Sequence, residues 1–212
     1  MIRYISFDVD GTLVDDKFDN EIWWHEIPKL YAKQYKISIE KAKMVVYSEY
    51  YKSLYIEKVN LWTDIEYWFK RLGLKDWKKL IDNTRKYVSL YHDTIETLGY
   101  LSKKYNLIII SDANKKFLDI KLDCKNIRNY FDYVFTSSED FGISQKNKEV
   151  FDKILKKLSI KSEEIVHIGD NNYLDYIVPS SLGIKSFYLK RSQEISKSDY
   201  IINSLTELKK KL

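Results

Sequence analysis

The 212-residue sequence contains one cysteine, two prolines and six glycines. A single cysteine, Cys124, excludes a disulfide framework and a metal site built from cysteines. The scarcity of glycine and proline excludes a collagen-like or low-complexity chain. The hydrophobic share, 44%, is too high for a disordered chain. We therefore expect a folded protein in a reducing, cytoplasmic setting.

Long apolar runs and a strong charge imbalance are also missing. The best apolar run, 107–110, has the length of a strand, whereas a membrane span needs about 20 residues. The first residues reach Asp8 before the apolar core of a signal peptide could form. Lys and Arg total 36 against 31 Asp and Glu, a net charge of +5. That excess suits an anionic substrate, and we expect neither a membrane nor a nucleic acid as partner.

The chain changes character twice. A short apolar segment, 2–7, runs into a polar turn that contains glycine, which predicts a strand followed by a functional loop. Apolar and aromatic residues then recur every three to four positions over 16–91, which predicts a helical insert of about four helices. From residue 93 onward, strand and helix patterns alternate.

The alternating region predicts a mainly parallel sheet with helices on both faces, an α/β doubly wound fold. The expected core comprises 1–15 and 92–212, and the expected inserted helical domain is 16–91. The predicted later strands are 107–111, 133–136, 165–168, 186–189 and 200–202. The predicted helices are 94–104, one carrying Phe151, Ile154, Leu155 and Leu158, one over 174–182, and one from about Leu205.

Ligands bind at the carboxyl ends of the strands in such sheets, so the residues that follow the strands matter most. These residues are Asp8 and Asp10, then Ser111, then Asp170 with Asp175. Carboxylates that close together repel one another and raise one another's pKa values. A hard divalent cation relieves the repulsion, and Mg²⁺ takes carboxylate oxygens together with substrate phosphate. The pattern therefore indicates a metal site for a phosphate group.

Two motifs make this interpretation specific. The segment 8–15 (DVDGTLVD) matches DxDGT, the first motif of the haloacid dehalogenase superfamily, and 169–175 (GDNNYLD) matches its last motif, GDxxxxD. Ser111 stands where the second motif places Ser or Thr after an apolar strand. The sequence thus resembles this superfamily, in the branch of phosphoglycolate phosphatases and β-phosphoglucomutases. The resemblance implies a Rossmann-like core with an inserted α-helical cap.

The resemblance also implies catalytic and metal-binding roles. Asp8 would attack phosphorus, and Asp10 would protonate the leaving oxygen and later deprotonate water. Asp10 would also offer its backbone carbonyl to the metal. Asp8 and Asp170 would bind Mg²⁺, and Asp175 would bind the metal or orient a lysine.

Phosphate-binding roles follow from the same resemblance. Thr12 and Ser111 would donate hydrogen bonds to the phosphoryl oxygens. Asp112 occupies a position where relatives often carry Asn, and we expect it to offer mainly its backbone N–H.

The third motif departs from the family pattern. Relatives read like GxxKPxPxIF, and the aligned stretch 142–151 places Gln145 where they carry the lysine. Lys146, one residue later, is the first choice for that role, both catalytic and phosphate-binding, and Lys148 is the second. The prolines of the pattern are also missing, which leaves the turn less preset.

We therefore predict a Mg²⁺-dependent phosphatase for a small phosphorylated metabolite, acting as a monomer or homodimer. The acid at position 10 argues against dehalogenation, because a halide leaves without a proton. A phosphomutase of the same branch and a non-catalytic phospholigand-binding protein remain alternatives, the latter because of Gln145. Trp23, Trp24 and His25 lie where relatives contact substrate, but aromatic residues at helical spacing more often pack within the cap.

Overall fold

The computed structural model describes residues 1–59, 63–191 and 198–212. The chain divides into two compact units, one formed by 1–15 with 90–212 and the other by 16–89. The boundary predicted from the sequence, at which the chain returns to the core after Tyr91, lies two residues later than the one in the structure. Among the described residues, no helix is both long and apolar enough to cross a membrane.

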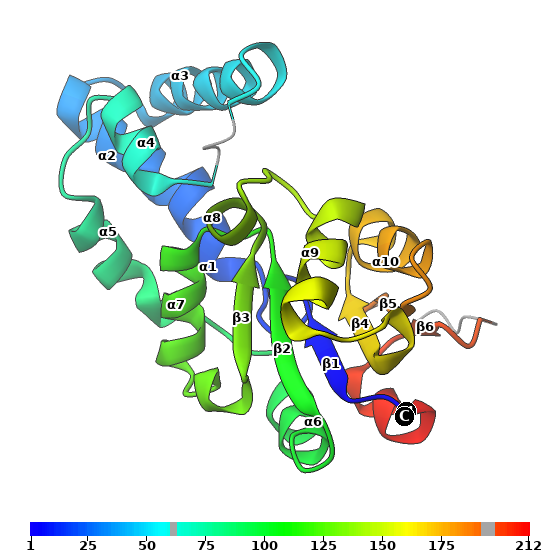
Figure 1. Ribbon diagram of the computed structural model, residues 1–212. Helices are drawn as coiled ribbons and strands as arrows, with labels where there is room; N and C mark the ends of the chain where they lie inside the picture. The colour runs from blue at the N-terminus through cyan, green and yellow to red at the C-terminus, as the bar shows by residue number, and fades with distance from the viewer. Residues whose placement is uncertain (60–62, 192–197) are drawn as a thin grey trace. The chain divides into compact units, whose positions relative to one another are not determined.

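The first unit is built on a six-stranded sheet in the order β3-β2-β1-β4-β5-β6, with every neighbouring pair parallel (Figure 1). The strands are β1 (Tyr4–Phe7), β2 (Asn106–Ser111), β3 (Tyr133–Thr136), β4 (Ile165–Gly169), β5 (Lys185–Leu189) and β6 (Ile201–Ile202). The predicted doubly wound α/β fold is confirmed. Because the chain builds outward from β1 first on the β2 side and then on the β4 side, the strand order reverses at β1, where such sheets bind ligands.

The central strands are buried on both faces. All four residues of β1 and all five of β4 are buried, as are the last five residues of β2. Tyr4, Ile108 and Ile110 join a core cluster with Val150 and Phe151 of helix α9 (Lys148–Leu158). Strands covered on both faces read as continuous apolar runs, which explains why these segments are recognisable in the sequence.

The helices of the first unit include two that the sequence reading does not predict. These are α7 (Lys115–Cys124) and α8 (Ser137–Phe141). The expected 174–182 helix is instead a π-helical turn, η6 (Asn172–Ile177), followed by α10 (Val178–Ser180). The remaining helical elements are α6 (Thr94–Leu101), η4 (Arg128–Tyr130), η5 (Ser162–Glu164), η7 (Leu205–Glu207) and α11 (Leu208–Lys211).

Every regular element among the described residues of the second unit is a helix. Its elements are α1 (Lys17–Asn20), η1 (Glu21–Glu26), α2 (Ile27–Tyr35), α3 (Ile39–Tyr51), η2 (Lys52–Ile56), α4 (Ile65–Arg71), α5 (Trp77–Thr84) and η3 (Arg85–Tyr87). Ser38 caps α3 by accepting a hydrogen bond from the Lys41 N–H, and Asp64 caps α4 in the same way from Glu66. Buried apolar residues of these helices form the core of the unit, Trp68 being the largest.

Trp23 and Trp24 both contact tyrosines of α3 in the second unit, although Trp23 is partly buried and Trp24 is 44% exposed. The Trp23 ring meets Tyr50 edge-on with ring centroids 6.1 Å apart, and the Trp24 ring meets Tyr47 at 5.1 Å. The two tyrosine hydroxyls donate hydrogen bonds to the backbone carbonyls of Trp23 and Trp24. These contacts support cap packing for the two tryptophans, and His25 is exposed.

The buried carboxylate of Asp93 binds Arg191, and Arg191 in turn binds the loop after β1. Asp93 accepts hydrogen bonds from both Arg191 Nη atoms (3.1 and 3.2 Å), from Ser204 Oγ (2.7 Å) and from the Leu205 N–H (2.8 Å). Arg191 also donates to the Thr12 carbonyl at 2.6 Å. Burial would raise the pKa of Asp93, but the hydrogen bonds outweigh it and lower the pKa.

We expect Asp93→Ala to destabilise the protein by about 3 kcal/mol, because it leaves the largely buried Arg191 without its carboxylate. Since folding lowers the pKa of Asp93, this contribution is present above about pH 4 and is lost as the pH falls below that. Urea unfolding at pH 7 measures the change, with the exposed Asp152→Ala as control. Equal stability of the two variants would contradict the assignment.

Candidate active site

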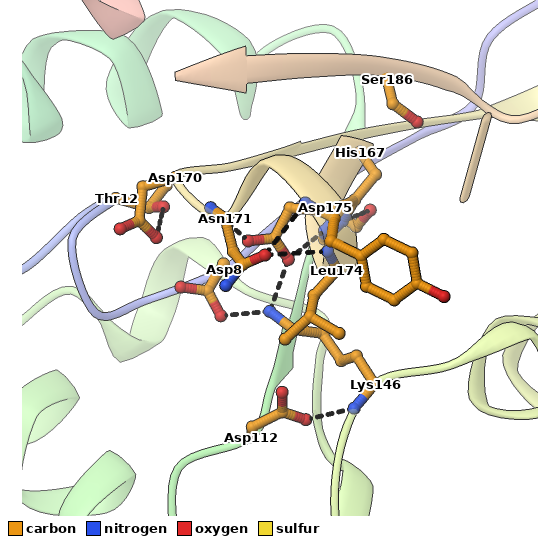
Figure 2. Close-up of polar contacts among 12 residues, drawn as sticks. Asp8, Thr12, Asp112, Lys146, His167, Asp170, Asn171, Leu174, Asp175 and Ser186 are labelled. Carbon is orange, nitrogen blue, oxygen red and sulfur yellow. Dashed lines mark hydrogen bonds and ion pairs between the residues drawn. The ribbon is translucent and has the colours of Figure 1, made fainter. Parts of the chain in front are cut away.

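The three motif-bearing strands, β1, β2 and β4, are adjacent in the sheet. Phe7 pairs with Ile109 on one side and with Ile168 on the other, so the three strands end at the same level. Parallel pairing therefore brings Asp8, Ser111 and Asp170 to one edge of the sheet. The loop between α8 and α9, which carries the third motif, brings Lys146 to Asp8 at this edge (Figure 2).

Lys146 lies at the centre of the polar contacts at this edge. Its Nζ donates to Asp8 Oδ1 at 2.6 Å and is 2.5 Å from Asp175 Oδ1 (Figure 2). The Lys146 side chain is only 3% exposed. Gln145 and Lys148 are both exposed. The structure thus brings Lys146, rather than either neighbour, between the carboxylates.

The charges of these three groups are mutually dependent. Burial alone would lower the pKa of Lys146, but Asp175 and Asp8 outweigh it, so the pKa is raised and the ammonium stays charged. Burial would raise the pKa of Asp175, yet Lys146 and His167 hold it below its usual value. For Asp8, burial prevails over the attraction of Lys146, and the pKa is raised.

Carboxylate oxygens of Asp8, Asp170 and Asp175 lie within 4.8 Å of one another, close enough to share a cation. Two glycines make the approach possible. A Cβ at Gly11 would lie 2.1 Å from Asp170 Oδ2, and one at Gly169 would lie 2.3 Å from Asp175 Cγ. Hard oxygen donors in a space kept open by glycine fit Mg²⁺.

Asp170 is the exposed member of this cluster. It is open to solvent, but loss of hydration raises the pKa of its carboxyl to about 6, and the charge of Asp175 adds to the effect. Thr12 Oγ1 lies 3.5 Å from Asp170 Oδ1, a weak hydrogen bond. A divalent cation would relieve this repulsion and favour the ionised form.

The other predicted phosphate-binding residues are at the same edge. Ser111 is buried at the end of β2, and its Oγ accepts a hydrogen bond from the Ala113 N–H at 3.1 Å. The Asp112 side chain accepts hydrogen bonds from Ser137 Oγ at 2.5 Å and from the Lys146 N–H at 2.6 Å. The carboxylate of Asp112 therefore holds the backbone of the third-motif loop.

The side chain of Asp10 is not among the carboxylates that could share a cation, although its negative charge helps to raise the pKa values of Asp8 and Asp170. Its Oδ1 accepts a hydrogen bond from Lys121 Nζ at 2.5 Å. Lys121 belongs to α7, and sequence reasoning misses it. The available signal is a lysine within an otherwise apolar helical stripe, next to Phe117, Leu118 and Leu122.

His167 is a second residue that sequence reasoning misses. It is buried within the apolar strand β4, where its Nε2 lies 3.1 Å from Asp175 Oδ1 and its Nδ1 lies 2.8 Å from Ser6 Oγ. Burial lowers the pKa of His167 more than Asp175 raises it. A neutral imidazole that donates from Nε2 would orient Asp175 toward Lys146. A polar residue inside a buried strand was the available signal.

Comparisons with known proteins agree with this geometry. Residues 5–189 match the family described as haloacid dehalogenase-like hydrolase. A glyceraldehyde 3-phosphate phosphatase of Pyrococcus furiosus is 26% identical over 98% of this chain and 91% of its own. A GMP/IMP nucleotidase of Escherichia coli is 23% identical over 79% of this chain and 73% of its own.

Among solved structures, a HAD phosphatase from Thermococcus onnurineus superposes with a TM-score of 0.81 at 24% identity. The alignment covers 99% of this chain and 97% of that one, so the fold is shared over the whole length. The resemblance inferred from the motifs is confirmed. The chain belongs to the haloacid dehalogenase-like hydrolase family.

Proposed function

We propose that this protein is a Mg²⁺-dependent phosphatase that hydrolyses a small phosphorylated metabolite through an aspartyl-phosphate on Asp8. The contact of the Lys146 ammonium with both Asp8 and Asp175 carries the proposal. It places a fixed positive charge beside a buried carboxylate, an arrangement suited to receiving an anionic group. Membership of a hydrolase family and relatives named as phosphatases support a phosphoric monoester hydrolase.

The reaction has two displacements at phosphorus. An Asp8 carboxylate oxygen attacks, the ester P–O bond breaks, and Asp10 gives a proton to the departing alcohol. Water then attacks the same phosphorus, Asp10 accepts its proton, and the bond from phosphorus to Asp8 breaks to release inorganic phosphate. Lys146, Thr12 and Ser111 would hold the phosphoryl oxygens during both steps.

Asp8, Asp170 and the backbone carbonyl of Asp10 would hold the metal. Asp175 would complete the acidic set, and its contact with Lys146 supports an orienting role. When bound, Mg²⁺ supplies positive charge that offsets the negative charge of the phosphoryl group.

We also assign the two compact units different tasks within this proposal. The first unit carries every residue given a chemical role, so it would be the catalytic core. The helical second unit, 16–89, would be the cap that recognises the leaving group. The relatives are named for substrates as different as glyceraldehyde 3-phosphate and the nucleotides GMP and IMP. Esters of both kinds are therefore the first metabolites to test.

Release of inorganic phosphate from p-nitrophenyl phosphate, glyceraldehyde 3-phosphate and GMP tests the proposal. We expect turnover of at least one ester with Mg²⁺ and its loss with EDTA, restored by excess Mg²⁺. Transfer of the phosphoryl group back to a sugar phosphate, without phosphate release, would indicate a mutase. Binding of phosphate esters without turnover of any of them would contradict an enzymatic role.

The affinity for Mg²⁺ should fall in acid. Since the pKa of Asp170 is raised to about 6 in the metal-free protein, the cation must displace a proton below that pH. We expect the apparent dissociation constant to increase by at least tenfold per pH unit well below pH 6, because Asp170 must then lose a proton to bind the cation. Titration calorimetry checks this, and an affinity independent of pH between 5 and 7 would count against Asp170 as a ligand.

A further inference from the structure

Helix α7 carries a lysine at a position that otherwise belongs to the core. Lys121 is 0% exposed and lies in the buried stripe with Phe117, Leu118 and Leu122. An ammonium without a partner in such surroundings is strongly unfavourable, whereas a methionine would fill the same volume at no electrostatic cost. Packing alone therefore does not explain a charged residue at this position.

Asp10 is an ion-pair partner of this lysine. Lys121 Nζ lies 2.5 Å from Asp10 Oδ1, and the two residues are 111 positions apart in sequence. Side chains on a helix lean toward its N-terminus, and α7 begins just after the carboxyl end of β2. Lys121 can thus extend from the core to the sheet edge without becoming exposed.

Only one end of this pair is accessible. The Asp10 side chain is 36% exposed and the Lys121 side chain 0%. A substrate can therefore reach Asp10 but not the ammonium behind it. Lys121 therefore does not bind the substrate directly, and any effect of Lys121 on the reaction passes through Asp10.

We propose that Lys121 is a positioning residue for Asp10, an inference that rests on the phosphatase function proposed above. Its ammonium binds Oδ1 and fixes the carboxyl group, so that the second oxygen is available to carry the proton to the leaving alcohol. Without Lys121, the Asp10 side chain is free to adopt other rotamers, and proton transfer loses its fixed geometry.

The dependence of rate on the leaving group separates this role from a merely structural one. Alkyl phosphates need a proton on the departing oxygen, whereas 2,4-dinitrophenolate leaves without one. We expect Lys121→Met to lower kcat/KM about 100-fold for an alkyl phosphate and less than threefold for 2,4-dinitrophenyl phosphate. The ratio kcat/KM reports the steps up to departure of the alcohol, so later hydrolysis of the aspartyl-phosphate does not obscure the result.

Lys125→Met, at the end of the same helix, is the matched control and should leave both values unchanged. A loss for Lys121→Met that is the same for both esters would overturn the positioning role, and so would no loss for either. If Lys121→Met does not fold, Lys121→Gln keeps a polar end and should show the same selective loss.

A second variant examines the route through Asp10. In an Asp10→Asn background, adding Lys121→Met should lower kcat/KM for the alkyl phosphate by less than a further twofold, in contrast to the 100-fold loss expected with Asp10 present, because the carboxyl group through which Lys121 acts is already gone. A further tenfold loss would show that Lys121 acts by another route. If the unmodified protein releases no phosphate from any ester with Mg²⁺, the phosphatase function fails and this inference fails with it; an active protein with an unselective Lys121→Met loses only the inference.

Discussion

Asp8→Asn should lower kcat by about 10⁴-fold or more for every phosphate ester, because it removes the nucleophile rather than a group that assists it. The expectation depends on the position of Asp8, which follows β1 directly and is within 2.6 Å of the Lys146 ammonium. After acid quenching of a reaction with ³²P-labelled substrate, the unmodified protein should carry label and the variant none. Asp152→Asn, an exposed change on α9, should keep full activity and labelling.

Loss of folding would not explain this result. Burial raises the pKa of Asp8, so at pH 7 the ionised carboxylate costs folding free energy that the neutral amide does not. Asp8→Asn should therefore unfold at the same temperature as the unmodified protein or at a higher one. A variant that keeps labelling and more than a tenth of the activity would show that Asp8 is not the nucleophile.

The sequence was sufficient to predict which segments form the strands and which carboxylates follow them. Strands buried on both faces read as apolar runs, and the residue after each run is visible without coordinates. Parallel pairing of β1 with β2 and β4 then determines that Asp8, Ser111 and Asp170 share an edge.

Polar residues that contact the site from within buried segments were not predictable in this way. Lys121 and His167 stand inside apolar segments, and only their tertiary surroundings show that each contacts a carboxylate of the site. The helix that carries Lys121 was not predicted at all. A pattern of apolar residues shows which face of an element is buried, but it does not show what a polar residue on that face meets.

The choice among Gln145, Lys146 and Lys148 also required the structure, because a loop without prolines can shift by one residue. Two hydrogen bonds explain the outcome together. Asp112, where relatives often carry Asn, accepts a hydrogen bond from the Lys146 N–H at 2.6 Å. Asn147 begins α9 by accepting a hydrogen bond from the Val150 N–H at 3.1 Å, which leaves Lys148 on the exposed first turn. The hydrogen bond from the Lys146 N–H to the Asp112 carboxylate thus fixes the conformation of this loop, which prolines would otherwise restrict.

Lys146→Met is accordingly expected to lower kcat about 10³-fold, because it removes the fixed positive charge beside Asp8 and Asp175. Lys148→Met should stay within twofold, since that side chain is exposed at the start of α9. Steady-state kinetics with p-nitrophenyl phosphate at saturating Mg²⁺ compares the two.

Lys146→Met also leaves two buried carboxylates without their ammonium, a loss of about 3 kcal/mol of stability, so activity must be expressed per folded molecule. Asp112→Asn gives an independent measure: it weakens the hold on the loop while keeping Lys146, and should lower kcat by about tenfold. A larger effect of Lys148→Met than of Lys146→Met would place the functional lysine two residues further along the chain. In that case the contact of Lys146 with Asp8 would serve folding alone, and Asp112 would have no bearing on turnover.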